Sequence, residues 1–304
     1  MKRREFLHQA TTAAVSVPFA ARASSASAAP ARTFKLKYAP HFGMFKESAA
    51  GDLFAELRFM ADAGFRAFED NGMMARPADV QQRIGDTLAQ LGMTMGVFVI
   101  DAGDNWKVSL ATGKPEFKER FVKACGDAVD VAKRCHAKWM TAVPGYFHRE
   151  ARMGIQTGNV IDALRAGADV LAPHGLVMVL EPLSDNPDLF LRTSDQAYAI
   201  CRAVNSPACK ILYDIYHMQR NEGHLIPNID AAWDEIAYFQ IGDVPGRKEP
   251  GTGETNYQNV FKHIHARMQE AGREFVLGME HGNSAEGTEG ERKVIDAYVR
   301  ADSF

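Results

Sequence analysis

The feature that most constrains the fold of this chain is a regular alternation of short apolar runs with helical patterns. Between the runs, apolar residues recur at helical spacing, as at Leu53, Leu57 and Met60. Strands separated by single helices must pair in parallel, because a parallel neighbour is reached only by a crossover connection. The expected strands are Phe34–Ala39, Phe65–Glu69, Met93–Ile100, Lys138–Val143, Leu176–Leu183, Lys210–Tyr216, Ala237–Gly242 and Phe275–Glu280.

Eight such units predict a closed (β/α)8 barrel, a TIM barrel of the α/β class, over residues 33–304. About 270 residues is an ordinary size for this barrel. The hydrophobic fraction of 46% is enough for one large core. An open doubly wound sheet is the alternative, but no G-x-G-x-x-G sequence follows the first strand, so a dinucleotide site is not indicated.

The N-terminus has the pattern of an export signal. Arg3-Arg4-Glu5-Phe6-Leu7 precedes the apolar run Ala10–Ala21, and Ala26-Ser27-Ala28 offers a small-residue cleavage site. The paired arginines are typical of the twin-arginine type, and the apolar run is too short to span a bilayer. We therefore expect a twin-arginine signal peptide over residues 1–28, export by the twin-arginine machinery, a periplasmic location and no stable membrane insertion. Whether the peptide is cleaved stays open.

Charge and cysteine content limit the partners of the protein. The net charge of −3 argues against a nucleic-acid binder, which needs an excess of Lys and Arg to neutralise phosphates. The cysteines Cys125, Cys135, Cys201 and Cys209 form no zinc-type motif, and buried thiols are favoured. Pairing of Cys201 with Cys209 and assembly into a homo-oligomer both stay open.

Oxygen-bearing side chains follow strands five to eight, where the chemistry of a parallel barrel gathers. These residues are Glu181, Asp214, Gln240 and Glu280. Carboxylates in apolar strands are costly to bury unless they are paired or bound to metal. Three carboxylates and one amide predict a Mg²⁺ or Mn²⁺ site, and zinc is less favoured although His217 leaves room for it.

Two of these carboxylates suggest the reaction. Glu181 and Glu280 come from strands five and eight and are expected to face each other across the barrel mouth. Two bases beside one polarised carbonyl could move a proton between adjacent carbons. After the first four strands, His41, Glu69, Trp106 and His148 could also reach the mouth. Trp106 is a substrate-binding candidate, since a loop aromatic can stack on a sugar, and His148 is more plausibly a solvated loop residue.

Several of these segments resemble a known family. Leu180–Leu183, Asp214–His217, Phe239–Ile241 and Gly278–Glu280 are similar to the strand-end motifs of xylose-isomerase-like barrels. The loop Gly242–Tyr257 resembles that of hydroxypyruvate isomerases, in which an Arg-x-Glu-Pro run precedes Gly-Glu-x-Asn-Tyr. The resemblance covers Glu181 to Glu280, about a third of the chain.

This resemblance implies metal ligation by Glu181, Asp214, Gln240 and Glu280. It also implies proton transfer by Glu181 and Glu280 and substrate contact by His217 and Arg247. Glu249, in the same loop as Arg247, is a further substrate-binding candidate. The Arg247 guanidinium could hold a substrate carboxylate by two parallel hydrogen bonds. One departure is His281, which stands where related isomerases carry a lysine shortly after the last glutamate.

The leading hypothesis is a metal-dependent isomerase that interconverts a small α-hydroxy aldehyde and a hydroxy ketone through an enediolate. Hydroxypyruvate and tartronate semialdehyde are the pair that the resemblance implies, and the partner is a sugar or hydroxy-oxo acid. A ketose 3-epimerase on the same metal centre is the nearest alternative. A non-catalytic periplasmic sugar-acid binding barrel is another. A DNA-repair endonuclease is disfavoured, because the sequence offers neither a His-rich zinc cluster nor a basic groove.

Overall fold

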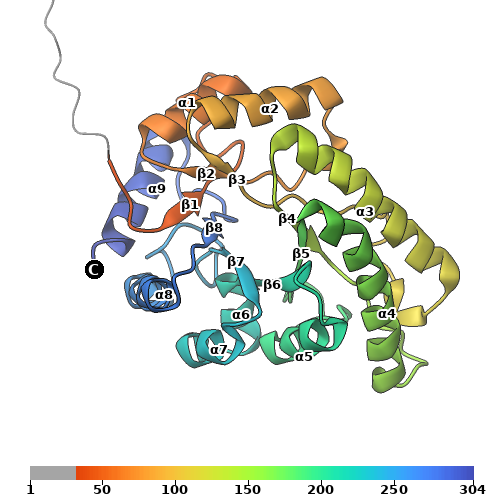
Figure 1. The fold of residues 1–304 in the computed structure, drawn as a ribbon. Coiled ribbons are helices and arrows are strands. Elements are labelled where there is room, and N and C mark those ends of the chain that lie inside the picture. Colours follow the sequence, from red (N-terminus) through yellow and green to blue (C-terminus); the bar gives the residue numbers. More distant parts are fainter. Residues whose placement is uncertain (1–31) are drawn as a thin grey trace, which may run out of the picture. The chain divides into compact units, whose positions relative to one another are not determined.

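The fold is a TIM-barrel-like α/β arrangement, seen in a computed structural model that describes residues 32–304. Figure 1 shows short strands at the centre and helices around them. Every expected strand is present, and each is shorter than predicted. The strands are β1 Lys37–Ala39, β2 Ala67–Phe68, β3 Thr94–Met95, β4 Trp139–Ala142, β5 Val177–Leu180, β6 Cys209–Asp214, β7 Ile236–Gln240 and β8 Val276–Gly278. The signal peptide predicted over residues 1–28 lies outside the described residues.

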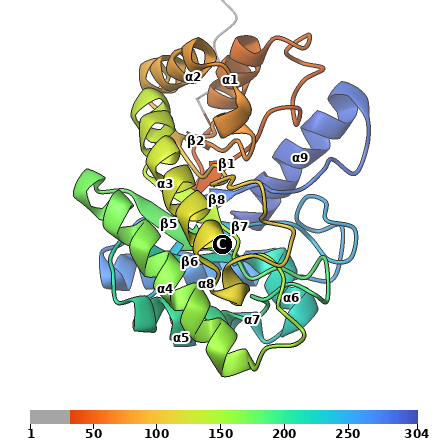
Figure 2. The ribbon, with the colours of Figure 1, turned by 90° about the vertical axis from the view of Figure 1, so that its right-hand side faces the viewer.

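Helices connect the strands and cover their outer side, as the view turned by 90° also shows (Figure 2). Gly64, Gly92 and Gly272 follow α1, α2 and α8 with φ of +100°, +65° and +60°, where glycine has no steric penalty. None of the helices within residues 32–304 is long and apolar enough to cross a membrane. The helices are α1 Leu53–Asp62, α2 Ala78–Gln90, α3 Pro115–Cys135, α4 Met153–Leu171, α5 Ser194–Val204, α6 Ile215–Asn221, α7 Leu225–Ala232, α8 Tyr257–Ala271 and α9 Gly287–Ala301.

All strand pairs are parallel, as the alternating pattern predicted. Six strands form one sheet in the order β1-β8-β7-β6-β5-β4, and β2 pairs with β3 in a second sheet. Isolated parallel bridges join the two sheets on both sides, between His41 and Glu69 and between Val99 and Thr141. Neighbouring strands are therefore consecutive in the chain, and β1 lies next to β8. Between β1 and β2 and between β3 and β4, single bridges replace a regular ladder.

The third predicted strand, Met93–Ile100, differs most from the structure. Only Thr94 and Met95 pair regularly, and their partner is β2. Beyond Gly96, the backbone of the same segment bonds to β4 instead, through Ile100 N to Thr141 O at 2.9 Å. The segment is extended throughout, but its two ends serve different neighbours, so no continuous ladder forms.

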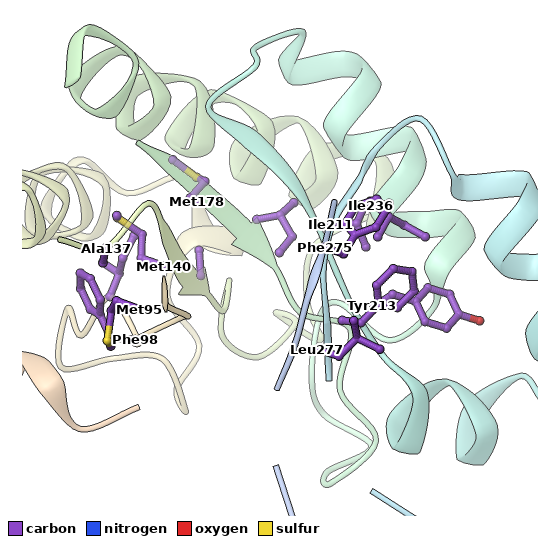
Figure 3. Packing of buried hydrophobic residues seen from close by; sticks show 14 of the residues in the cluster. Met95, Phe98, Ala137, Met140, Met178, Ile211, Tyr213, Ile236, Phe275 and Leu277 are labelled. Atoms are coloured by element: carbon purple, nitrogen blue, oxygen red, sulfur yellow. The ribbon is translucent and has the colours of Figure 1, made fainter. Parts of the chain in front are cut away.

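Two hydrophobic layers hold the strands. The larger layer lies between strands and helices, and Figure 3 shows part of it, including Met178, Ile211 and Leu277. The smaller layer comes from the alternate strand positions and is made of Ala39, Ala67, Val97, Val179, Leu212, Tyr238 and Val276. Because side chains alternate along a strand, these residues fill the inside of the barrel.

The inner layer determines which residues reach the mouth. Two positions beyond an inward residue, the side chain points to the same face again. This spacing leads from Val179 to Glu181, from Leu212 to Asp214 and from Tyr238 to Gln240. The same step leads from Ala67 to Glu69. Polar side chains thus form the next layer above the inner apolar one.

The four cysteines are buried free thiols, in agreement with the favoured interpretation. Burial raises the pKa of Cys125 to about 12 and that of Cys135 to about 11. These two thiols therefore stay protonated at neutral pH and behave as small apolar groups in α3.

Candidate metal centre at the barrel mouth

Four side chains that the sequence singled out converge in the structure. Glu181, Asp214, His217 and Glu280 each offer one ligand atom, and these atoms all lie within 4.8 Å of one another. The four residues follow β5, end β6, lie in α6 and follow β8, so segments a hundred residues apart meet at one point. Asp214 and His217 are fully buried, and the Glu280 side chain is 25% exposed.

Asp214 is held by the start of the helix that follows it. It ends β6 and caps α6, where its Oδ1 accepts a hydrogen bond from Tyr216 N at 2.7 Å. This leaves Oδ2 directed at the cluster, 3.4 Å from His217 Nε2. The immediate change from strand to helix therefore brings both Asp214 and His217 to the same site.

Gln240 joins this site through the sheet register. It pairs with Asp214 of β6 on one side and with Gly278 of β8 on the other. Its Nε2 donates to Glu69 Oε1 at 3.4 Å, whereas its Oε1 is buried without a hydrogen-bond partner in residues 32–304. The amide oxygen is thus left for a group that the protein itself does not supply.

The site passes a simple test for a bound cation. Glu181 Oε1 and Gln240 Oε1 are both buried without a hydrogen-bond partner among the described residues. Leaving such atoms unpaired costs free energy, and native proteins rarely do so without a water or an ion. The carboxylates and the amide oxygen are ligands that suit a hard divalent cation. The residues present therefore fit a metal ion.

His217 has a different role in this cluster from that of the oxygen ligands. Two atoms of Ser184 contact His217 Nδ1: the backbone N–H donates to it at 3.2 Å, and the hydroxyl oxygen lies 2.8 Å from it. With the backbone N–H as a donor, Nδ1 is the unprotonated nitrogen, and the hydroxyl is a second donor to it. Burial lowers the pKa of His217, so the ring is neutral and its one proton lies on Nε2. A protonated nitrogen cannot ligate a metal. We infer that His217 donates a hydrogen bond at the site and that Gln240 is the fourth ligand.

Arg247 closes one side of the cluster. Its Nη2 donates to Asp214 Oδ2 at 3.1 Å and to Glu280 Oε2 at 2.6 Å, and its Nε donates to the backbone oxygen of Glu280. The guanidinium also lies over the Tyr216 ring, 4.9 Å from the centroid. The structure therefore places this predicted substrate-binding residue directly at the cluster, where its charge offsets those of the carboxylates.

A cavity opens beside Glu280. It has a volume of about 320 Å³, and its polar lining includes His41, Glu69, Asn71 and Glu280. Asn71 donates to Glu280 Oε1 at 2.7 Å, a contact that sequence reasoning missed although Asn71 stands two residues after Glu69. A larger cavity of about 740 Å³ also borders His41 but is lined by none of the four clustered side chains. The smaller cavity is therefore the one of these two that adjoins the cluster.

Comparison with known proteins agrees with this geometry. Residues 57–298 match the family described as xylose isomerase-like TIM barrel. The chain belongs to this family. Hydroxypyruvate isomerase of Escherichia coli is 30% identical over 70% of this chain and 83% of its own length. The 2-oxo-tetronate isomerase of Cupriavidus necator is 27% identical over 72% of this chain and 83% of its own. These relatives cover most of the barrel.

A solved structure of low sequence identity shares the fold. The D-psicose 3-epimerase with D-tagatose from Clostridium cellulolyticum H10 superposes with a TM-score of 0.70 at 14% identity, covering 88% of this chain and 98% of the epimerase. At this identity the likeness concerns the fold alone. It confirms the TIM-barrel-like architecture that the alternation of strands and helices predicted.

Two of the predicted substrate-binding residues, Glu249 and Trp106, do not belong to the cluster. Both carboxylate oxygens of Glu249 accept hydrogen bonds from Ser284, one of them from the backbone N at 2.9 Å. Glu249 is 2% exposed and thereby ties the loop after β7 to the loop after β8. Trp106 lies 53% exposed in the loop after β3. A substrate contact of either residue stays a prediction, and for Glu249 the geometry favours a positioning role.

The carboxylates at the site are held in an unfavourable state when no cation is bound. Burial raises the pKa of Glu181 well above its usual value, and the charges of Glu280 and Asp214 add to the shift. Burial raises the pKa of Glu280 to about 7, although Arg247 acts in the opposite direction. Burial and the charge of Glu280 raise the pKa of Glu69. Mutual repulsion and desolvation are the conditions that a bound cation relieves.

The metal-free protein is therefore expected to lose stability as pH rises from about 5 to about 7.5. The folded state keeps protons on Glu181 and Glu280 that the unfolded state releases above the ordinary pKa of 4.5, so the free energy of unfolding falls through this window. Calorimetric melting in EDTA should give a lower Tm at pH ~7.5 than at pH ~5. Added Mn²⁺ should raise Tm more at the higher pH, because it binds the deprotonated groups. A Glu280→Gln variant that melts with an unchanged pH dependence would contradict this origin.

Proposed function

We propose that this chain is a divalent-metal-dependent isomerase of small hydroxy-oxo acids. Its reaction interconverts an α-hydroxy aldehyde and the corresponding hydroxy ketone. The observation that carries the proposal is the pair Glu181 and Glu280, two carboxylates in one buried cluster beside a cavity. The isomerases among its relatives support the reaction class.

Glu181, Asp214, Gln240 and Glu280 would hold the ion. Their oxygen atoms favour Mg²⁺ or Mn²⁺ over softer metals. When bound, the ion supplies Lewis-acid polarisation of the substrate carbonyl. The side chains of the protein supply the proton transfers and the contacts with the substrate.

Glu280 is the proposed base that takes the proton from carbon. It is the one carboxylate of the cluster that lines the cavity of about 320 Å³. Asn71 and Arg247 each hold one of its carboxylate oxygens, which fixes the direction from which the proton is taken. Loss of this proton gives an enediolate-type anion. Return of a proton to the adjacent carbon, together with transfer of the hydroxyl proton to the former carbonyl oxygen, completes the isomerisation. His217 stabilises the charge on the substrate oxygen with its Nε2–H.

Glu181 is the proposed second proton-transfer group. Its Oε1 is buried without a partner in the described residues, 3.7 Å from His217 Nε2. A second carboxylate on the opposite side of the substrate allows the proton to return from a different direction than it left. Epimerisation next to a ketone requires this arrangement, and isomerisation can also use it.

Arg247 supports a carboxylate in the substrate. Its guanidinium is 27% exposed and lies at the edge of the cluster, so it can exchange a contact with Glu280 for one with an anionic substrate. The export signal predicted over residues 1–28 extends the proposal to a periplasmic enzyme, carried there by the twin-arginine machinery.

A direct assay tests the proposal. Protein stripped with EDTA should be inactive, and Mn²⁺ should restore conversion of hydroxypyruvate to tartronate semialdehyde. A panel of neutral ketoses, followed by chromatography, serves as the parallel assay. Epimerisation of a ketose without turnover of hydroxypyruvate would favour the 3-epimerase alternative. Mn²⁺ binding with turnover of neither class would favour the binding protein.

A further inference from the structure

Glu69 is a buried carboxylate to which the proposed reaction gives no task. It follows β2, is 1% exposed and makes no ion pair with any Lys, Arg or His among the described residues. Its two oxygens are instead used by two donors of β7. Tyr238 donates its hydroxyl proton to Oε2 at 3.0 Å, and Gln240 donates an amide proton to Oε1 at 3.4 Å.

The direction of these hydrogen bonds follows from the carboxylate, which has no proton to donate when it is ionised. Glu69 then accepts from Tyr238 and from Gln240, and it can accept from Gln240 only through the amide nitrogen. Since an amide has one donor side and one acceptor side, Gln240 must turn its Oε1 away from Glu69.

Two glycines leave the room for this arrangement. A Cβ at Gly278 would collide with Glu69 Oε2, and one at Gly96 would collide with the Tyr238 hydroxyl oxygen. Neither glycine has a positive φ, so each position needs glycine for space and not for backbone conformation. The inner face of the barrel is therefore shaped around the Glu69 and Tyr238 side chains.

We propose that Glu69 is a positioning residue that fixes the Gln240 amide with its oxygen toward the metal site. The inference rests on the proposed metal site and adds a residue from the end of β2 to those that build it. Without an acceptor at Glu69, the Gln240 amide could turn and present its NH₂ group to the cation, which it cannot ligate. Partners that orient a metal ligand in this way typically contribute about 10- to 100-fold in metal affinity.

Glu69→Gln is the decisive substitution because it changes one acceptor into a donor at nearly constant volume. When the oxygen of the introduced amide keeps the hydrogen bond from the Tyr238 hydroxyl, its NH₂ group faces Gln240 and turns that second amide. We expect Mn²⁺ affinity, measured by titration calorimetry, to fall by about 10- to 100-fold. The Tm in EDTA should stay unchanged or rise, because a buried carboxylate without a cation is removed.

A second background separates orientation from charge. In Gln240→Glu, either carboxylate oxygen can face the ion, so the side chain has no amide to orient. A glutamine at position 69 can donate to the other oxygen, whereas the ionised Glu69 cannot. If Glu69 acts through orientation, adding Glu69→Gln to this variant should not lower Mn²⁺ affinity, in contrast to its effect beside Gln240. An effect through charge alone would lower affinity by the same factor in both backgrounds and would overturn the inference.

Gly278→Ala provides an independent perturbation, because its Cβ displaces the Glu69 carboxylate. It should weaken Mn²⁺ binding as Glu69→Gln does, whereas the control Gly126→Ala, whose Cβ meets nothing within 4 Å, should not. Unchanged affinity in Glu69→Gln would overturn the role of Glu69 while leaving the metal site standing. A wild-type protein that does not bind Mn²⁺ would overturn both this inference and the proposed function.

Discussion

Replacing Glu280 by glutamine is expected to lower kcat by about 10²- to 10⁴-fold, the range that a general base contributes. Glutamine keeps an oxygen that can face the cation and can accept from Asn71 Nδ2, which bonds to Glu280 Oε1 at 2.7 Å in the wild type. It cannot take a proton from carbon. Steady-state kinetics with saturating Mn²⁺ measures the loss, and calorimetry checks that the ion is still bound.

Glu274→Gln is the matched control for this prediction. Glu274 lies at the other end of the same strand, just before β8, and its side chain is 82% exposed. The same chemical change there should leave kcat unaltered. A Glu280→Gln enzyme that binds Mn²⁺ and keeps more than about a tenth of wild-type kcat would show that another group takes the proton.

The second large effect distinguishes two candidates for the fourth metal ligand. Gln240→Leu should weaken Mn²⁺ binding by at least about 100-fold. Residues that only orient a metal ligand contribute up to about 100-fold in affinity, and a ligand itself is expected to contribute at least as much. His217→Asn should leave Mn²⁺ affinity within a few-fold and should instead raise KM or lower kcat. The reason is the proton on Nε2, which the Ser184 backbone N–H dictates by donating to Nδ1 at 3.2 Å.

Both variants are to be compared by calorimetry and by thermal melting in EDTA, since each changes a buried side chain. An equal loss of Mn²⁺ affinity in the two variants would mean that His217 ligates the ion through Nε2. Solution NMR of ¹⁵N-labelled histidine offers a separate check. The shift of Nε2 should be that of a protonated nitrogen in the metal-free and in the Mg²⁺-bound protein.

The strand-end residues could be predicted because their signal is local. An apolar strand that closes on Glu181 or Asp214 marks both the position of the residue and the end of the barrel where it lies. Parallel strands place all such ends on one side, so convergence of four of them follows from topology. His41 and Glu69 after the first two strands also line the cavity, as the same reasoning suggested.

Other parts of the site depend on partners that no local pattern reveals. Asn71 was missed because its role is a contact with Glu280, more than two hundred residues away along the chain. Ser184 acts through its backbone N–H, which leaves no trace in the residue type. Glu249 was expected at the substrate because its loop resembles that of hydroxypyruvate isomerases, yet its carboxylate is occupied by Ser284.

The amino-acid sequence by itself determined the parallel barrel and the end of the barrel where the oxygen-rich cluster forms. Both follow from the periodicity of apolar residues and from the order of the strands, which depend on residues close together in the chain. Only the tertiary structure decided which side chains act together. The regular ladder between β2 and β3 is short, the tautomer of His217 depends on Ser184, and the orientation of Gln240 depends on Glu69. Each of these is a hydrogen bond between distant segments, and its direction follows from packing that brings one donor and one acceptor face to face.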